Sequence, residues 1–189
     1  MRLIIHAGAN KAASSTLQSF WNLNSSKLAE FGIYYKREIL SKDRYYGGGN
    51  AKDLINKIIK KRNLKPFFKK LVKEANSINC NTIFISSESI FSITENIDDK
   101  KWFLDEISKI FDVIKLIYIL RDLHSHASST IKHRLLNHKI IKPFKWLIEE
   151  YEYPKCIINL AKINDIYQEE IKFQFIHYNN ELDPLNITK

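Results

Sequence analysis

The chain has 189 residues, of which 44% are hydrophobic and 27% are charged. These values are typical of a globular protein, and the length is sufficient for a single domain, residues 1–189, with a hydrophobic core. No apolar run approaches the roughly 20 residues that a membrane-spanning helix requires, and the N-terminus lacks the apolar stretch of a signal peptide. We therefore expect a cytoplasmic protein without a membrane span.

The net charge is strongly positive, at +9 from 30 basic and 21 acidic residues. Such an excess is compatible with nucleic acid, a membrane surface, a polyanionic glycan or an anionic cofactor. Much of it lies within residues 52–73, where a helical pattern favours a solvated helix face. No nucleic-acid motif is present, so nucleic acid is not an expected partner. Cys80 and Cys156 do not indicate a disulfide framework.

Short apolar runs alternate with helical patterns along the chain. Strands are predicted at residues 3–5, 82–86, 113–120 and 171–176. Helices are predicted over residues 15–30, 99–111, 126–139, 143–151 and 155–168, with a basic helical stretch over 51–79 that Pro66 interrupts. The Gly-Gly-Gly-Asn run at 47–50 is interpreted as a flexible break. This alternation predicts an α/β fold of three layers, with a central parallel sheet flanked by helices.

The first predicted strand leads into a small-residue loop that contains Gly8 and Lys11. Three hydroxyl side chains follow, Ser14, Ser15 and Thr16, and Ser14 is a suitable N-cap for the next helix. The free N–H groups and the dipole at a helix N-terminus bind phosphate and sulfate. The loop therefore predicts an anion site. Spacing alone gives equal support to a surface loop with a capping serine and a solvated lysine, and the order is not that of the Walker motif.

A second candidate site follows the predicted strand at residues 113–120. Arg121 stands at the end of this strand, and Ser129 follows eight residues later. An arginine can bind a phosphate through two parallel hydrogen bonds, and a serine in the first turn of the next helix can add a third. The alternative is that Arg121 pairs with Asp122 while Ser129 caps a helix.

The two candidate sites together resemble the PAPS-dependent sulfotransferase superfamily, in its bacterial and carbohydrate-acting branches. The first is similar to the family's 5′-phosphosulfate loop, with the pattern H-x-G-x-x-K-x-x-S-S-x-L-Q over residues 6–18. Arg121 and Ser129 have the spacing of the pair that holds the 3′-phosphate. The resemblance implies a nucleotide-binding fold of the P-loop type. It also implies PAPS (3′-phosphoadenosine 5′-phosphosulfate) as donor, 3′,5′-ADP as product and a hydroxyl acceptor, with a glycan favoured and no metal required.

The resemblance also implies roles for individual residues. Lys11 would neutralise the charge that develops on the leaving phosphate, and Glu88 would take the proton of the acceptor. Glu88 follows the strand at 82–86 in a Ser-Ser-Glu run, and the alternative is a glutamate placed at a helix N-terminus by the dipole. The other residues implied to bind the cofactor at its 5′ end are Gly8, Ala12, Ala13, Ser14, Ser15 and Thr16.

The sequence departs from the family pattern in two respects. Ala12 and Ala13 replace the family's threonine and glycine, and a methyl group near the phosphate narrows the cradle. The chain also ends soon after its last strand, where family members continue into a basic segment that closes over the 3′-phosphate. The alternative to an active enzyme is therefore a non-catalytic relative that binds 3′,5′-ADP, PAPS or a glycan. Other P-loop-like phosphotransferases and a basic binding module remain open as well.

The histidines do not predict a metal site. His6 lies in the first strand, where a hydrogen-bonded structural role is favoured. The spacing of the others repeats no known ligand motif, and solvated or capping roles are favoured for His124, His126, His133 and His138.

Overall fold

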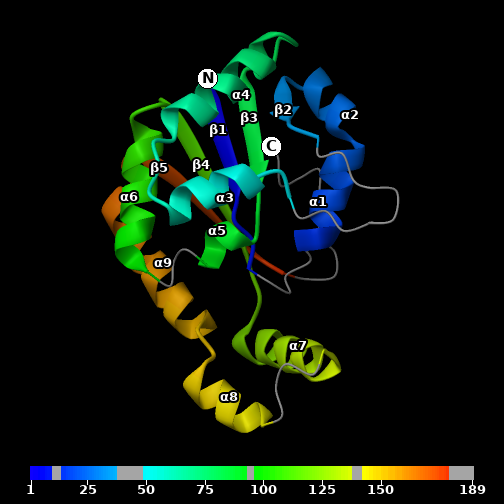
Figure 1. Cartoon of the computed structure of the whole chain (residues 1–189), viewed down its shortest axis with the longest axis vertical. Helices are drawn as coiled ribbons and strands as arrows, with labels where there is room; N and C mark the ends of the chain where they lie inside the picture. The colour runs from blue at the N-terminus through cyan, green and yellow to red at the C-terminus, as the bar shows by residue number, and fades with distance from the viewer. Residues whose placement is uncertain (10–13, 38–48, 93–95, 138–141, 179–189) are drawn as a thin grey trace.

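Five parallel strands form the central layer of the molecule (Figure 1). The computed structural model describes residues 1–9, 14–37, 49–92, 96–137 and 142–178. The strands are β1 Arg2–His6, β2 Ile33–Tyr35, β3 Thr82–Ser86, β4 Val113–Leu120 and β5 Ile171–His177. Their order across the sheet is β2-β3-β1-β4-β5, so β1 occupies the centre.

Helices cover both faces of this sheet. They are α1 Ser14–Leu23, α2 Ser25–Glu30, α3 Lys52–Ile59, α4 Lys65–Asn76, α5 Ser89–Ser92, α6 Ile97–Ser108, α7 Leu123–Leu136, α8 Pro143–Glu149 and α9 Tyr153–Tyr167. On one face, Trp21 of α1 packs edge-on against Phe84 of β3. On the other, Tyr34 of β2 donates a hydrogen bond to Glu74 of α4. The predicted three-layer α/β fold is thereby confirmed.

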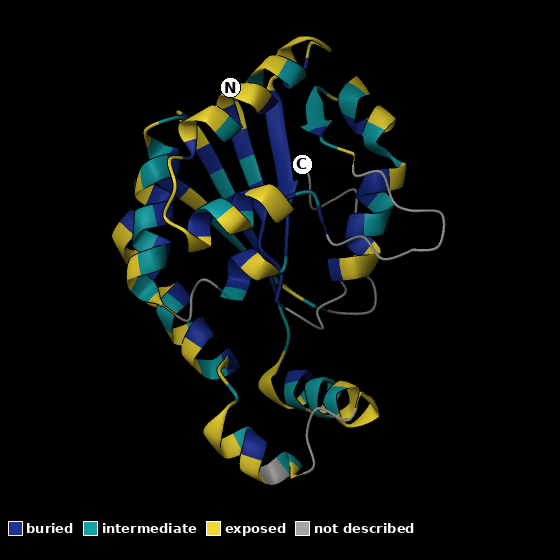
Figure 2. Cartoon of the chain, viewed as in Figure 1, coloured by how far each residue is buried: buried dark blue, intermediate teal, exposed yellow. Residues whose placement is uncertain are grey.

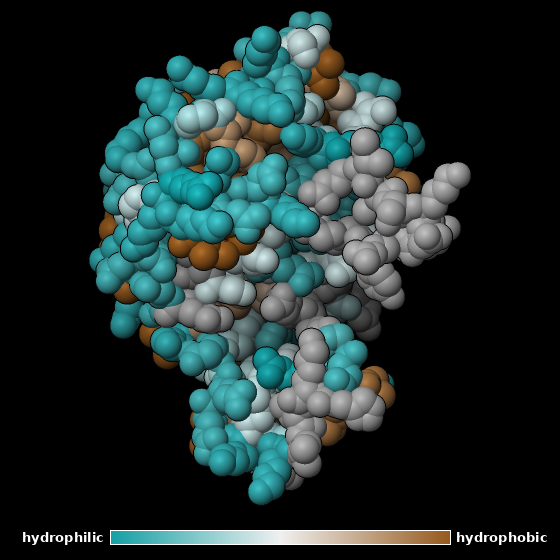
Figure 3. Space-filling model, in the orientation of Figure 1, coloured by the Kyte–Doolittle hydropathy of each residue, from teal (hydrophilic) through white to brown (hydrophobic). Residues whose placement is uncertain are grey.

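The core is centred on β1, β3 and β4, which have helices on both sides. Leu3, Ile5, Leu116 and Ile119 are fully buried, and every residue of β3 is buried (Figure 2). Burial of an isoleucine or leucine side chain contributes about 1.5–3 kcal/mol. Because both faces are covered, these strands have the continuous apolar sequence by which they were predicted. The surface in Figure 3 is mostly hydrophilic, as the lysine-rich α3 and α4 require.

The structure corrects the prediction of one helix over residues 15–30. Asn24 separates α1 from α2, and both its backbone N–H and its side-chain Nδ2 donate to the carbonyl of Phe20. This side chain competes with the helical hydrogen-bond ladder, as asparagine does in turns. The three-residue strand β2 that follows was not predicted.

Helix α7 also begins earlier than predicted. Asp122 is its N-cap, and the carboxylate accepts a hydrogen bond from the N–H of Ser125 at 2.8 Å. The cap places the first turn at Leu123 rather than at residue 126. In Figure 1, α7 and α8 lie beyond the carboxyl end of β4. No helix in the described ranges is long and apolar enough to cross a membrane.

Candidate functional site

The segments that follow β1, β3 and β4 meet at the carboxyl edge of the sheet. After β1, the N–H groups of Ala7 and Ala9 donate to carbonyls of β4, at 2.9 and 3.3 Å. After β3, the N–H of Ser87 donates to the carbonyl of His6 at 3.0 Å. The three candidate segments therefore share one edge, which is where open α/β sheets bind ligands.

The two described ends of the first loop are tied together by Ser14. Its hydroxyl donates to the carbonyl of Ala9 at 3.2 Å, and its side chain is buried. Ser14 is the first residue of α1, so this hydroxyl closes the loop instead of serving as the predicted N-cap. Lys11, Ala12 and Ala13 lie outside the described residues. This hydrogen bond fixes the start of α1 against the end of the described segment that follows β1.

Gly8 is required by the packing under this loop. A Cβ atom at this position would lie 2.6 Å from both the ring of His6 and the hydroxyl of Ser14. His6 is fully buried, and its Nδ1 is 2.8 Å from the hydroxyl of Ser86. Burial lowers the pKa of His6 to about 3, so the ring is neutral at physiological pH. His6 therefore has the structural role expected for it.

The start of α1 is linked to the segment after β3. Ser15 and Thr16 are exposed in the first turn of α1, and the hydroxyl of Ser15 donates to Oε1 of Glu88 at 3.5 Å. Glu88 immediately precedes α5, which is consistent with either of its predicted roles. The first N–H groups of a helix have no partners within the helix. An anion in this position would have N–H and hydroxyl donors beside it, with a carboxylate close by.

Arg121 lies at the same edge of the sheet, and its backbone is held by Tyr153. The Arg121 N–H donates to the Tyr153 hydroxyl at 2.9 Å, and this hydroxyl donates back to the Arg121 carbonyl at 2.8 Å. The guanidinium lies 5.2 Å from the centre of the Tyr178 ring. Ser129 is half-buried in the second turn of α7, not in the first turn as predicted, because Asp122 starts the helix early.

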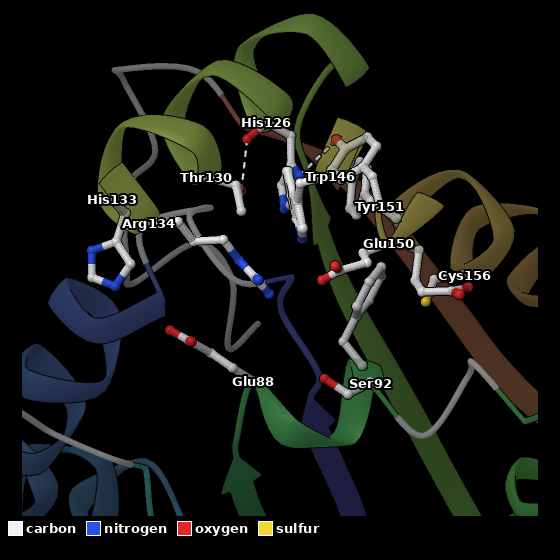
Figure 4. Close-up of a pocket in the computed structure, with 13 residues that line it drawn as sticks. Glu88, Ser92, His126, Thr130, His133, Arg134, Trp146, Glu150, Tyr151 and Cys156 are labelled. Carbon is white, nitrogen blue, oxygen red and sulfur yellow. Dashed lines mark hydrogen bonds between the residues drawn. The ribbon is translucent and has the colours of Figure 1, made fainter. Parts of the chain in front are cut away.

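A cavity of about 640 Å³ opens beside Glu88 (Figure 4). We call it the aromatic cavity, and its described lining residues are Glu88, Phe91, Ser92, His126, Thr130, His133, Arg134, Trp146, Glu150, Tyr151, Glu152, Tyr153 and Cys156. Figure 4 shows Glu88, Arg134 and Glu150 extending into it from three different segments. Its size is within the range of small-molecule sites.

The wall of this cavity is a stack of rings from α7 and from the start of α9. His126 lies parallel to Tyr153, with ring centres 3.7 Å apart, and its Nδ1 is 2.8 Å from the Tyr151 hydroxyl. Burial is the main factor that raises the pKa of both tyrosines, so their hydroxyls remain protonated donors. Arg134 stacks on Trp146, with its guanidinium carbon 4.5 Å from the ring centre. The cavity offers flat apolar surfaces together with charged and hydroxyl groups.

The sequence did not predict that most of these residues line a cavity. His126 was predicted to be solvated or to cap a helix, but it is buried against the two tyrosines. His124 and His133 are exposed, and His138 lies outside the described residues. The signal available in the sequence was a cluster of three aromatic residues, Trp146, Tyr151 and Tyr153. In the described part of the chain, no three His, Cys, Asp or Glu side chains are placed to hold a metal ion.

The predicted flexible break at 47–50 is structured at its described end. Asn50 donates from Nδ2 to the carbonyl of Phe84 and accepts from the N–H of Ser86, at 3.0 and 2.8 Å. Gly49 has a φ of +72°, and a Cβ there would lie 2.0 Å from the Ser86 carbonyl oxygen. Gly49 and Asn50 thus cover the end of β3 beside Ser87 and Glu88, which corrects the prediction for these two residues.

Comparisons with known proteins do not assign the chain to a family. No protein-family model matches the chain, and no curated protein is significantly similar to it. A solved structure of deoxyadenosine kinase from M. mycoides with bound dCTP is similar over 97% of this chain and 92% of that chain. The two sequences are 16% identical, and the TM-score is 0.39. The fold is therefore described by its own architecture, an α/β sheet with the strand order β2-β3-β1-β4-β5.

Proposed function

We propose that the chain transfers a sulfuryl group from PAPS to a hydroxyl of an acceptor held in the aromatic cavity, with a glycan as the favoured acceptor. The observation that carries the proposal is the position of Glu88. It contacts Ser15 at the start of α1 and also lines the cavity. A donor at the start of α1 and an acceptor in the cavity would therefore both lie next to this carboxylate.

The described residues at the start of α1 offer hydrogen-bond donors suited to the 5′-phosphosulfate end of such a donor. Ser15 and Thr16 are exposed in the first turn of the ten-residue helix α1, whose N–H groups favour an anion. Lys11 would add a positive charge from the same loop. PAPS supplies an activated sulfuryl group, and the bond from sulfur to the 5′-phosphate oxygen breaks as the acceptor oxygen bonds to sulfur. Lys11 and the α1 N-terminus would stabilise the charge left on the 5′-phosphate.

Glu88 would act as the general base for the acceptor. A carboxylate within hydrogen-bond reach of a hydroxyl accepts its proton as the oxygen becomes the nucleophile. The half-buried ring of Tyr151 would pack against the flat apolar side of a ring, such as a sugar ring. The Glu150 carboxylate, which also lines the cavity, would accept hydrogen bonds from its hydroxyl groups.

Arg121 and Ser129 would distinguish the donor from ordinary adenylates by binding its 3′-phosphate. Arg121 is held at the carboxyl end of β4 by the two hydrogen bonds with Tyr153. A guanidinium binds phosphate through two parallel hydrogen bonds, which provides both affinity and orientation. This assignment follows from the resemblance and from the position of Arg121 at the shared edge of the sheet.

The experiment that tests the proposal compares three nucleotides by thermal unfolding and then measures turnover. We expect 3′,5′-ADP to raise the Tm clearly and 5′-AMP to raise it much less. We also expect label from ³⁵S-PAPS to appear on a pool of glycans. Binding of 3′,5′-ADP without transfer would support the non-catalytic relative. A preference for ATP with magnesium would indicate a phosphotransferase, and equal shifts from 3′,5′-ADP and 5′-AMP would refute the 3′-phosphate site.

A further inference from the structure

A second cavity, of about 950 Å³, opens at the opposite edge of the sheet. We call it the basic groove. It includes the first residues of four strands, which are Arg2, Ile33, Thr82 and Val113. Because the strands are parallel, their first residues mark the amino edge, and the site at Glu88 lies at the carboxyl edge. A ligand in the basic groove would not occupy the site proposed for PAPS.

The groove lies between the sheet and the α1–α2 pair. Phe20, Leu28 and Phe31 line it from this pair, and Ile4 lines it from the sheet. Phe31 is 74% exposed and Val113 is 51% exposed, whereas Leu28 is only 3% exposed. The apolar lining thus continues from an open mouth to a closed floor between two packed layers.

Four basic side chains surround this apolar lining: Arg2, Lys27, Lys115 and Lys172. No acidic residue is found among the described residues that line the groove. Within the described ranges, none of the four forms an ion pair, and Arg2 instead donates to the side chain of Asn81 at 3.5 Å. Apolar walls that carry several positive charges complement a molecule with one apolar end and one negative end.

Two of these basic residues, Lys115 and Lys172, are direct neighbours in the sheet. They are register partners on β4 and β5, so their side chains leave the sheet on the same face. Like charges directly opposite each other in a sheet are destabilising. Burial and, after it, the charge of Lys172 lower the pKa of Lys115. An anion placed between the two ammonium groups would relieve this repulsion.

We propose that the basic groove binds a fatty acid, with its acyl chain between α1–α2 and the sheet and its carboxylate on Lys115 and Lys172. The inference concerns a part of the molecule that the proposed sulfuryl transfer does not use. The acyl chain would pack on the apolar lining of the groove, and its carboxylate would face the lysine pair. The cavity volume is within the range of sites that enclose small molecules.

The test is isothermal titration of the whole chain with laurate below its micellar concentration. Dodecanol and dodecylammonium have the same chain length and serve as neutral and cationic probes. We expect laurate to bind at least about tenfold more tightly than either, since only laurate offers an anionic acceptor for charge-assisted hydrogen bonds from the two lysines. The double variant Lys115→Gln/Lys172→Gln should lose about tenfold in laurate affinity, and its Tm should not fall, because the repulsion between the two lysines is removed. Phe31→Ser, at an exposed position, should lower the affinity for all three probes because it removes apolar contact with the chain that they share.

A matched control is Lys69→Gln/Lys70→Gln, which removes two exposed charges from α4. This control should bind laurate like the wild type. Equal binding of the three probes, or unchanged laurate affinity in Lys115→Gln/Lys172→Gln, would overturn the proposal. Cosedimentation with phosphatidylglycerol vesicles without binding of laurate would also overturn it, in favour of a membrane surface. The Tm shift caused by 3′,5′-ADP should be the same in all these variants, so this test is separate from that of the proposed function.

Discussion

The hydroxyl of Ser15 donates to Oε1 of Glu88 across 3.5 Å, which joins the first turn of α1 to the residue before α5. The two residues follow neighbouring strands, β1 and β3, and are 73 positions apart in the sequence. Glu88 also lines the aromatic cavity, so it stands between a helix N-terminus and a space for a second molecule. This position is the basis for the first prediction.

Glu88→Gln should bind nucleotide normally but transfer sulfate slowly. Glutamine has nearly the same shape but cannot accept the acceptor's proton, and loss of a general base costs about 10²- to 10⁴-fold in rate. Titration with 3′,5′-ADP and the initial rate of sulfate transfer provide the two readouts. Glu149→Gln, at an exposed position on α8, is the matched control and should retain full activity. Full activity of Glu88→Gln would remove Glu88 from this role.

Arg121→Ala and Ser129→Ala should each lower the affinity for 3′,5′-ADP and leave the affinity for 5′-AMP nearly unchanged. The reason is that both side chains are assigned to the 3′-phosphate, and a charged hydrogen bond contributes about 1.5–3 kcal/mol. Titration with the two nucleotides gives the comparison, and the Tm without ligand checks the fold. Arg62→Ala removes an exposed arginine elsewhere and is the control. Equal losses for both nucleotides would assign these residues to another part of the ligand.

Lys11→Ala should instead lower the affinity for both nucleotides. Lys11 is assigned to the 5′-phosphate, which 3′,5′-ADP and 5′-AMP share, so the two affinities should fall by a similar factor. Lys69→Ala, which removes an exposed lysine of α4, is the control. A loss confined to 3′,5′-ADP, or no loss at all, would contradict this assignment.

The central strands could be predicted from the sequence because strands buried on both faces consist of continuous apolar runs. The strands β1, β3 and β4 are covered on both faces, and their sequences are continuous apolar runs. The strand β2 has three residues and lies at the edge of the sheet, which is too short a run to distinguish. The break at Asn24 was missed because the apolar pattern continues to Leu28 across it.

The candidate site was predictable only in part, because only some of its residues leave a local signal in the sequence. Glu88 and Arg121 follow directly after predicted strands, so the topology alone places them at one edge. The aromatic cavity has no such signal, because segments far apart in the sequence build it. His126 meets the hydroxyl of Tyr151 from 25 positions away, and no local pattern encodes that contact.

Gly49→Ala should destabilise the protein much more than Gly32→Ala. Both glycines have a φ of +72°, so alanine is strained at either position. At Gly32 the nearest atom to a new Cβ is 3.5 Å away, whereas at Gly49 the Ser86 carbonyl oxygen is at 2.0 Å. We expect a loss of roughly 1–2 kcal/mol for Gly32→Ala and roughly 2–4 kcal/mol for Gly49→Ala, measured by urea unfolding. Equal losses would mean that Gly49 does not pack closely on β3.

The last prediction concerns Lys100, a fully buried lysine of α6. Its ammonium nitrogen has no hydrogen-bond partner among the described residues and lies 5.3 Å from the centre of the Tyr118 ring. Burial lowers the pKa of Lys100 from 10.5 to about 7. Between these two values the unfolded chain binds a proton that the folded protein does not, so the free energy of unfolding increases with pH across this window. Below about pH 7 both states carry the proton, and the full cost of burying the charge remains.

Lys100→Met should therefore stabilise the protein, and more so at neutral than at alkaline pH. Methionine fills a similar volume without a charge, so the gain should be on the order of a few kcal/mol at pH 7 and should become small near pH 10. Urea unfolding of the wild type and the variant at both pH values measures this difference. Lys101→Met, on the same helix but half-exposed, is the control and should show no such dependence. An equal effect of Lys100→Met at pH 7 and pH 10 would show that the lysine is not buried in its neutral form, because only the titration of a buried amine makes the stabilisation depend on pH in this range.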